Sequence, residues 1–375
     1  MLTGIAAFFL FVERWTKWRL FSFFPPLLFI YFVPMLLSNI GVLAHEGPVY
    51  DWMNDTMLPF LLVIVLLKVD VVSAVRVMGR GMLVMLCGGA GVILGAPLVY
   101  SLVKDRLDPT AWKAFGSLAG SWIGGTANMA AVGQGLGASG TEFGLAVLGD
   151  NMVYIVWLPI LLASKGLAPW FNRFTRVDPR RMEMLERTGV EAKAVDERIA
   201  VPHFLYLLFL GFAATLAAGV IAGLLPEVPP VLTASTWRIL LVTTFGLMLS
   251  ATPARKIPGS QELAIALIYL FVANTGARAD LSGLREQVIW FLLAAYLWVG
   301  LHGLACILGA RLFRVDIHST AIASVANIGG AAGASLVAAH HNPRLVPVGI
   351  LMALMGYALG TYGGFIAAWL CQRIS

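Results

Sequence analysis

Long apolar stretches separated by short polar segments dominate the chain. The hydrocarbon core of a bilayer is about 30 Å thick and requires about 20 apolar residues of helix. On that scale twelve candidate spans follow one another, at 2–13, 20–43, 54–69, 81–103, 112–135, 141–164, 200–224, 235–251, 259–277, 287–311, 317–340 and 345–371. The first is short and is interpreted as a short helix or membrane anchor. The pattern predicts an all-α, polytopic transmembrane helix bundle embedded in a lipid bilayer.

One polar segment interrupts this pattern near the middle of the chain. Residues 165–199 contain eight basic and six acidic side chains. We interpret the segment as a solvated linker between two membrane halves, residues 1–164 and 200–375. No other stretch of the sequence is as highly charged.

The composition supports a membrane protein over a soluble one. Hydrophobic residues make up 59% of the 375 residues and charged residues 12%, whereas a soluble domain has roughly 25% charged residues. The net charge of +6 could suggest nucleic acid, but basic residues collect in the cytoplasmic loops of membrane proteins. No nucleic-acid partner is therefore predicted. The three cysteines match neither a disulfide framework nor a zinc site.

The loop charges predict an orientation. Lys68, Arg76 and Arg80 mark the loop at residues 69–80 as cytoplasmic. In the second half, basic residues mark alternate loops as cytoplasmic, so residues 278–286 fall outside; these basic residues are Arg255, Lys256, Arg311, Arg314 and Arg373. The two assignments conflict by one crossing if all twelve spans are counted. Either one span is miscounted or one segment is re-entrant.

An internal repeat relates the two halves. A shift of 205 residues places six residues on identical ones without a gap: Ile123, Gly124, Gly125, Ala127, Val132 and Gly144 on Ile328, Gly329, Gly330, Ala332, Val337 and Gly349. The loops at 70 and 280 are also equivalent and face opposite sides by their charge. This is the pattern of inverted-topology repeats, which many secondary transporters share.

Two glycine-interrupted spans are the first candidate site. Adjacent glycines weaken a helix by about 1 kcal/mol each relative to alanine, and non-helical backbone at membrane depth is tolerated where it lines a cavity. We therefore predict helix breaks near 112–135 and 317–340. The alternative is close helix packing through small residues. Candidate substrate-binding residues at the breaks are Ser121, Gly124, Gly125, Asn327, Gly329 and Gly330.

Asp150 is the second candidate, because it is the sole charged residue between Phe143 and Leu162. A carboxylate deep in a membrane costs about 3 kcal/mol on insertion scales, and proteins retain it for an ion pathway, a proton relay or a counter-ion. The alternative is a position near the helix end or a pairing with an interior arginine. We predict an ion site, holding sodium or a proton, formed by Asp150, Asn151, Thr126 and Asn128.

Other polar residues add less. Asn274 and Thr275 could line the cavity or merely cap their span, and Gln261 and Glu262 open that span. No histidines have metal-ligand spacing. The sequence lacks nucleotide-binding and hydrolase motifs and a nucleophile–base pair within the spans, so no enzyme activity and no cofactor beyond the coupling ion are predicted.

Four stretches carry a resemblance to a known family: residues 120–128, 149–151, 326–330 and 360–363. They resemble the YjcL-like family of bacterial membrane proteins, long labelled as a domain of unknown function, over nearly the whole chain. That family is grouped with the superfamily of cation:proton antiporters and anion transporters, which includes sodium:bile-acid symporters and NhaA-like antiporters. The resemblance implies a panel domain, a core domain, and two broken helices that cross near the bilayer centre. It also implies a bacterial cytoplasmic (inner) membrane; homodimers are common in the superfamily.

One departure from the antiporters affects the functional hypothesis. They often carry two adjacent carboxylates, whereas Asp150 stands beside an amide. The leading hypothesis is an ion-coupled secondary transporter for a small organic solute, with an organic anion favoured by positive half-helix ends. The first alternative is a cation:proton antiporter without an organic substrate. The second is a receptor or scaffold that acts through residues 165–199.

Overall fold

The fold was analysed in a computed structural model that describes residues 1–18, 20–23, 25–70, 79–177, 199–279 and 287–375. Within these ranges the regular structure is helical, and the one β-type pairing is an isolated bridge between Val228 and Leu232. The predicted all-α class is therefore confirmed. Most of the predicted linker, residues 178–198, lies outside the described residues.

Helices long enough to cross a bilayer are present throughout. Six apolar helical stretches in the described ranges have the required length: Pro48–Leu66, Arg80–Arg106, Gly140–Thr175, Val201–Ala222, Val288–Phe313 and Pro343–Gln372. Two shorter apolar helices accompany them, α3 (Pro26–Asn39) and α14 (Ala234–Ser250). A multi-pass membrane protein is the class that this fold supports.

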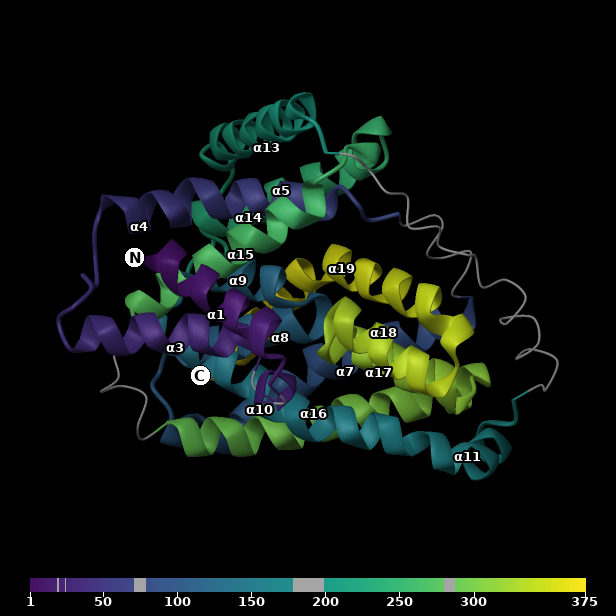
Figure 1. Cartoon of the computed structure of the whole chain (residues 1–375). Coiled ribbons are helices and arrows are strands. Elements are labelled where there is room, and N and C mark those ends of the chain that lie inside the picture. Colours follow the sequence, from purple (N-terminus) through teal and green to yellow (C-terminus); the bar gives the residue numbers. More distant parts are fainter. Residues whose placement is uncertain (19, 24, 71–78, 178–198, 280–286) are drawn as a thin grey trace.

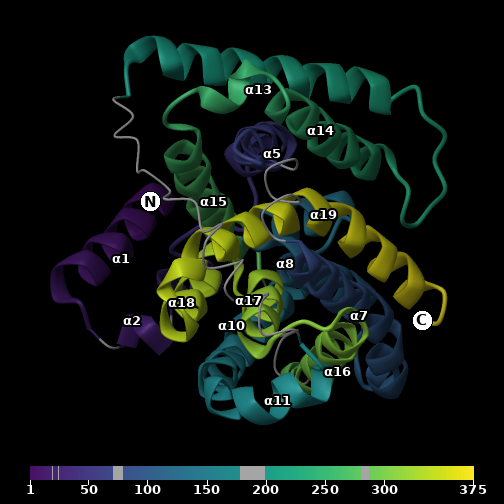
Figure 2. The same ribbon diagram turned by 90° about the vertical axis from the view of Figure 1, so that its right-hand side faces the viewer.

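The helices pack as two groups, each drawn from both halves of the sequence. The flanking group contains α1 (Leu2–Thr16), α3, α5 (Leu58–Leu66), α13 (Val201–Ala222), α14 and α15 (Ser260–Ala277). In both views α13 and α14 lie beside α5 at the edge of the molecule (Figures 1 and 2). Short helices α2 (Leu20–Phe23) and α4 (Pro48–Trp52) and a π-helical turn (Met53–Met57) join these elements.

The second, hairpin group contains the longest helices. These are α7 (Arg80–Val103), α10 (Gly140–Ala163), α16 (Val288–Phe313) and α19 (Val346–Gln372), with the short α11 (Ala168–Thr175) after α10. Between them lie four shorter helices, α8 (Trp112–Gly124), α9 (Thr126–Gly135), α17 (Ile317–Ile328) and α18 (Gly330–His341). The most extensive contacts join α7 to α16 and α8 to α19.

Helices α8 and α9 form an antiparallel pair, which we call hairpin 1. Gly125 separates them with φ 82° and ψ 179°, a conformation that glycine adopts without steric cost. The Lys113 ammonium donates a hydrogen bond to the Gly137 carbonyl over 3.0 Å, so the start of α8 meets the end of α9. Midway along, a β-carbon on Gly133 would lie 3.1 Å from the Ser117 hydroxyl.

Helices α17 and α18 form hairpin 2 in the same way. Gly330 has φ 57° at the turn. The His318 and His341 rings, at the start of α17 and the end of α18, approach with 3.0 Å between their Nδ1 atoms. A β-carbon on Gly333 would lie 2.9 Å from Val325, and both views show the two helices side by side (Figures 1 and 2).

These hairpins correct the expected course of the chain. Breaks near 112–135 and 317–340 were expected in helices that continue across the bilayer centre. That course is wrong, because each segment reverses at its glycine and returns to the end where it started. The reversal removes one crossing between residues 69–80 and 278–286, so the two charge-based loop assignments now agree.

The hairpins enter from opposite ends of the molecule. Hairpin 1 leads directly into the first residue of α10, whereas the His340 carbonyl at the base of hairpin 2 accepts a hydrogen bond from Lys165, just beyond the end of α10. Because α10 has 24 residues with a rise of about 1.5 Å each, these bases are about 36 Å apart. The two turns therefore point toward each other.

One charged residue lies at an unexpected end. Arg373 was grouped with Arg255 as cytoplasmic. The preceding helix instead brings the chain end beside Lys104, whose ammonium donates to the Ile374 carbonyl. Lys104 follows α7, while Arg255 pairs with Asp70 near the start of α7. Arg373 and Arg255 are therefore at opposite ends, because α19 starts at the base of hairpin 2 and runs away from it.

Candidate functional site

A cavity of about 670 Å³ lies where the two hairpin turns meet. Its walls include Gly125 and Thr126 from hairpin 1 and Gly329 and Gly330 from hairpin 2. The remaining walls come from the middle of α10 and the first half of α19. They also include the ends of α3, α5 and α15 that lie nearest Asp70 and Arg255. The cavity thus lies between the hairpin group and the flanking group.

Asp150 projects into this cavity from the middle of α10. The side chain is half-buried, and its Oδ1 is fully buried without a hydrogen-bond partner among the described residues. The Ser121 hydroxyl and the Trp122 indole face the carboxyl, yet the Trp122 Nε1 is also buried without a partner. A buried polar atom that makes no hydrogen bond costs about 1–3 kcal/mol, so this carboxyl is poised to accept a bound cation or proton.

Asn151 and Thr126 line the same cavity as this carboxyl. The Asn151 Nδ2 donates to the Val147 carbonyl over 2.8 Å, which orients the amide so that its oxygen is the atom it can offer a ligand. Thr126 is the first residue of α9, where backbone N–H groups have no helical acceptor.

The predicted site residues are only partly brought together. Seven of them line the cavity: Ser121, Gly125, Thr126, Asp150, Asn151, Gly329 and Gly330. Gly124 lies behind the turn of hairpin 1, where a β-carbon would meet the Asn128 side chain and the Gly356 carbonyl. Its small size therefore serves packing.

Asn128 and Asn327 form hydrogen bonds away from the cavity. Asn128 donates to the Gly124 carbonyl over 2.6 Å and accepts from the Thr361 hydroxyl over 2.5 Å, so it fastens the turn of hairpin 1 to α19. Asn327 donates to the Met85 carbonyl over 2.9 Å and is fully buried. Neither lines the cavity.

Asn274 and Thr275 lie away from the cavity, in the flanking group. The Asn274 amide donates to Asn54 in the π-helical turn over 2.9 Å. The Thr275 hydroxyl donates to the Phe271 carbonyl of its own helix over 3.0 Å. Their polarity is used in contacts within the flanking group.

Five polar lining residues were not predicted as site residues: Lys68, Tyr154, Gln261, Tyr269 and Tyr357. Tyr154 follows Asp150 by four residues and so shares its helix face, a spacing that could have identified it. Tyr154 packs against Gly329 of hairpin 2, and Tyr357 packs 3.2 Å from the β-carbon position of Gly125 in hairpin 1. Helix α10 thus places a tyrosine against the turn of hairpin 2, and α19 places one against the turn of hairpin 1.

A buried polar chain holds hairpin 2 to the helices around it. The Trp157 indole donates to the Ser324 hydroxyl over 3.0 Å, and Ser324 lies 2.9 Å from the His302 Nε2. The His302 Nδ1 lies 3.0 Å from the Gly88 carbonyl. Since a carbonyl only accepts, Nδ1 donates to the Gly88 carbonyl. The His302 imidazole therefore links α7, α16 and α17.

Charge in the cavity is sparse. Among the described residues, its lining has one acidic and one basic side chain, Asp150 and Lys68. The first turns of α9 and α18 add the partial positive charge of helix N-termini. A cation at the carboxyl and an anion at the first turns of α9 and α18 match this distribution.

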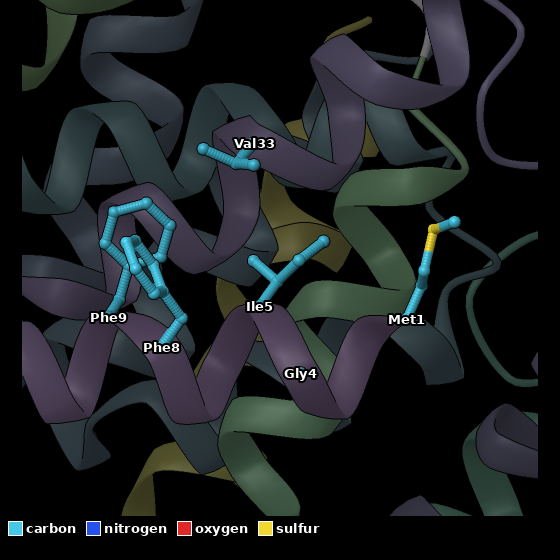
Figure 3. A pocket seen from close by; sticks show the side chains of 6 residues that line it. All are labelled: Met1, Gly4, Ile5, Phe8, Phe9 and Val33. Atoms are coloured by element: carbon cyan, nitrogen blue, oxygen red, sulfur yellow. The ribbon is translucent and has the colours of Figure 1, made fainter.

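A smaller hollow elsewhere is purely apolar. It encloses about 380 Å³ and is lined by Met1, Gly4, Ile5, Phe8, Phe9 and Val33. Figure 3 shows the α1 side chains beside Val33 of α3. It offers no group that could bind an ion, so it does not compete with the Asp150 cavity as an ion site.

Comparison with known proteins places the chain in a family. The family model described as "Protein of unknown function (DUF819)" matches residues 1–373. The chain belongs to this family. It is 27% identical over 348 residues to the uncharacterized membrane protein YjcL of Bacillus subtilis (strain 168), covering 89% of this chain and 87% of that protein.

This DUF819 protein is therefore a membrane protein with several apolar, membrane-length helices. In its described residues, no group of three or more His, Cys, Asp or Glu side chains is arranged to hold a metal ion. The donors at the cavity are one carboxylate, hydroxyls, amides and backbone groups. Carboxylate, hydroxyl and carbonyl oxygens are ligands for hard cations.

Proposed function

We propose that this protein is an ion-coupled secondary active transporter of a cytoplasmic membrane. Sodium or a proton binds at Asp150 and Asn151, and a small organic solute occupies the rest of the cavity. The observation that carries the proposal is the partnerless Asp150 oxygen inside a cavity formed by two opposed hairpin turns. A carboxyl retained at such depth is a functional group by default.

The element order supports an inverted repeat. Helices α5, α7, hairpin 1 and α10 are followed in the second half by α15, α16, hairpin 2 and α19. The 205-residue shift pairs Gly125 with Gly330, and both have positive φ. If α3 and α14 are counted as the first helix of each repeat, α13 is the membrane-length helix between the repeats among the described residues, and its crossing inverts the second. Transporters with this symmetry bind their ligands at the repeat interface near the midplane.

The two helix groups suggest how access alternates. The cavity is bounded by the hairpin group on one side and the flanking group on the other. Movement of one group against the other would open the shared cavity first to one end and then to the other. Loop charges assign the end near Arg255 and Lys165 to the cytoplasm, and the cavity extends toward that end.

The charge distribution favours an anionic solute. The first turns of α9 and α18 border the cavity and provide positive potential. The tyrosines and the aliphatic side chains around them suit an apolar body, as in most small-molecule sites. A solute with a carboxylate and an apolar part fits both features.

A thermal-stability screen tests the ion site directly. Purified protein would be heated with sodium, lithium, a range of pH values and a library of organic anions. A ligand that binds only the folded state at a concentration of 100 Kd adds about 2.7 kcal/mol to the free energy of unfolding. We expect sodium or low pH to raise the Tm, with a solute adding to the effect.

The matched variants identify the group responsible. Asp150→Asn should abolish the ion-dependent rise in Tm, because it removes the carboxylate charge while keeping the side-chain shape. Asp105→Asn is the control, since Asp105 is exposed beyond the end of α7. An ion response that survives intact in Asp150→Asn would remove the proposed ion site.

A further inference from the structure

We propose that Tyr31, Gly140, Gly144 and Ala279 form a seal that closes the cavity at the end opposite Arg255, and that the absence of a side chain at Gly140 sets how tightly it closes. The seal would act in the proposed transport cycle, so this inference rests on the proposed function.

The seal is a backbone-to-backbone contact between the two helix groups. Gly140 begins α10 in the hairpin group, and Ala279 follows α15 in the flanking group. A β-carbon on Gly140 would lie 2.6 Å from the Ala279 Cα and backbone nitrogen. Real β-carbons do not approach backbone so closely, so the groups touch here because residue 140 has none.

Tyr31 reinforces the contact from α3. Its hydroxyl donates to the Gly140 carbonyl over 2.7 Å, and it fills the space where a β-carbon of Gly144 would lie. The ring is fully buried and packs against Phe143, with 6.3 Å between ring centroids. Removing the hydroxyl would weaken the seal without removing this packing.

Further bonds join the groups at the same end. The Thr236 hydroxyl donates to the Gly135 carbonyl over 2.9 Å, and the Ser235 hydroxyl to the Gln134 carbonyl over 3.3 Å. Both carbonyls belong to the base of hairpin 1. The cavity, in contrast, extends toward the base of hairpin 2. The described conformation is therefore closed at the first end and open at the second.

One helix connects the seal with the ion site. Gly140, Gly144, Val147 and Asn151 follow at spacings of four, three and four, which place them on one face of α10. Asn151 is about 16 Å from Gly140 along the helix axis. A shift of α10 against the flanking group would therefore change the seal and the ion site together.

Sided labelling of a cavity residue tests the seal. The reporter is Ala332→Cys, since Ala332 is exposed and lines the cavity at the turn of hairpin 2. A membrane-impermeant thiol reagent would be added to either face of sealed vesicles, and modification of this peptide followed by mass spectrometry. With no other change, we expect fast modification from the Arg255 end and slow modification from the opposite end.

Gly140→Ala in this background should raise the rate from the sealed end about tenfold, which corresponds to a shift of about 1.4 kcal/mol between the two states. Gly300→Ala is the control, because a β-carbon there meets nothing within 4 Å in the middle of α16. Tyr31→Phe is the second variant, and it should raise the same rate to a smaller extent.

The proposed seal would be overturned if the modification rate from the sealed end stayed at the control value in both Gly140→Ala and Tyr31→Phe. Tm values must show that both variants are folded. The assay needs no substrate. Sodium-dependent Tm shifts in the same preparations report on Asp150 separately, so failure of the ion site and failure of the seal give different results.

Discussion

At the scale of single residues, glycine and aspartate give the cavity its character for different reasons. Asp150 brings a charge-bearing group to a depth where it is costly. The glycines bring backbone close to backbone, at the hairpin turns and where α8 meets α19. The Gly360 β-carbon position, for example, is 2.7 Å from the Gly124 Cα. The glycines thus allow the close helix packing that positions the polar groups of the cavity.

Gly125 offers a prediction at this scale. With φ 82° and ψ 179°, a side chain there is strained by about 1–3 kcal/mol, and its β-carbon would press on the Tyr357 ring at 3.2 Å. We expect Gly125→Ala to lower the Tm by several degrees and to weaken the ion-dependent rise in Tm, both read in a thermal unfolding assay.

Gly300→Ala again provides the comparison and should leave the Tm unchanged or slightly higher, because alanine favours a helix interior. The same pair separates the transporter from a receptor that acts through the charged linker. A receptor would tolerate Gly125→Ala in its function and lose that function when the linker is deleted.

At the scale of elements, the sequence predicted the hairpins only in part. The apolar lengths predicted membrane helices, but as twelve spans, whereas six helical stretches in the described residues are long enough to cross a bilayer. The paired glycines predicted interruptions at the right places. A re-entrant segment was left open as one explanation of the crossing conflict, but the reversal was not assigned to these residues, because a glycine pair in sequence fits a kink, a break or a turn equally well. The conflict of one crossing in the loop charges was the signal that a segment returns.

The same limit explains which site residues were missed. Asp150, Asn151 and Thr126 could be predicted, since polar side chains in apolar spans are conspicuous. The sequence does not show that the Asn128 amide is used by Thr361, or that Lys68 and Gln261 meet the cavity from the other helix group. Those facts depend on contacts between distant segments.

Hairpin topology gives the second prediction at this scale. Single cysteine variants at Thr110 and Ala138 flank hairpin 1, and variants at Arg314 and Arg344 flank hairpin 2. We expect an impermeant thiol reagent to reach Thr110→Cys and Ala138→Cys from one side of the membrane, and the other two from the opposite side. Labelling of Thr110→Cys and Ala138→Cys from opposite sides would mean that residues 112–135 cross the bilayer.

At the scale of the whole molecule, the proposed transport requires that the two helix groups move against each other. The cavity separates them toward the Arg255 end, while Tyr31 and Gly140 join them at the other. Each group contains helices from both halves of the sequence, which is the arrangement that two intertwined repeats produce. Coupling follows if ion and solute must both occupy the cavity before the seal can open.

The central claim is tested most directly by uptake into proteoliposomes of a solute that raises the Tm, with and without an imposed sodium or pH gradient. We predict gradient-driven accumulation that Asp150→Asn abolishes and Asp105→Asn retains. Ion exchange against protons without any solute would favour the antiporter instead. Folded, correctly inserted protein that moves neither solute nor ions under any gradient would contradict the transporter proposal.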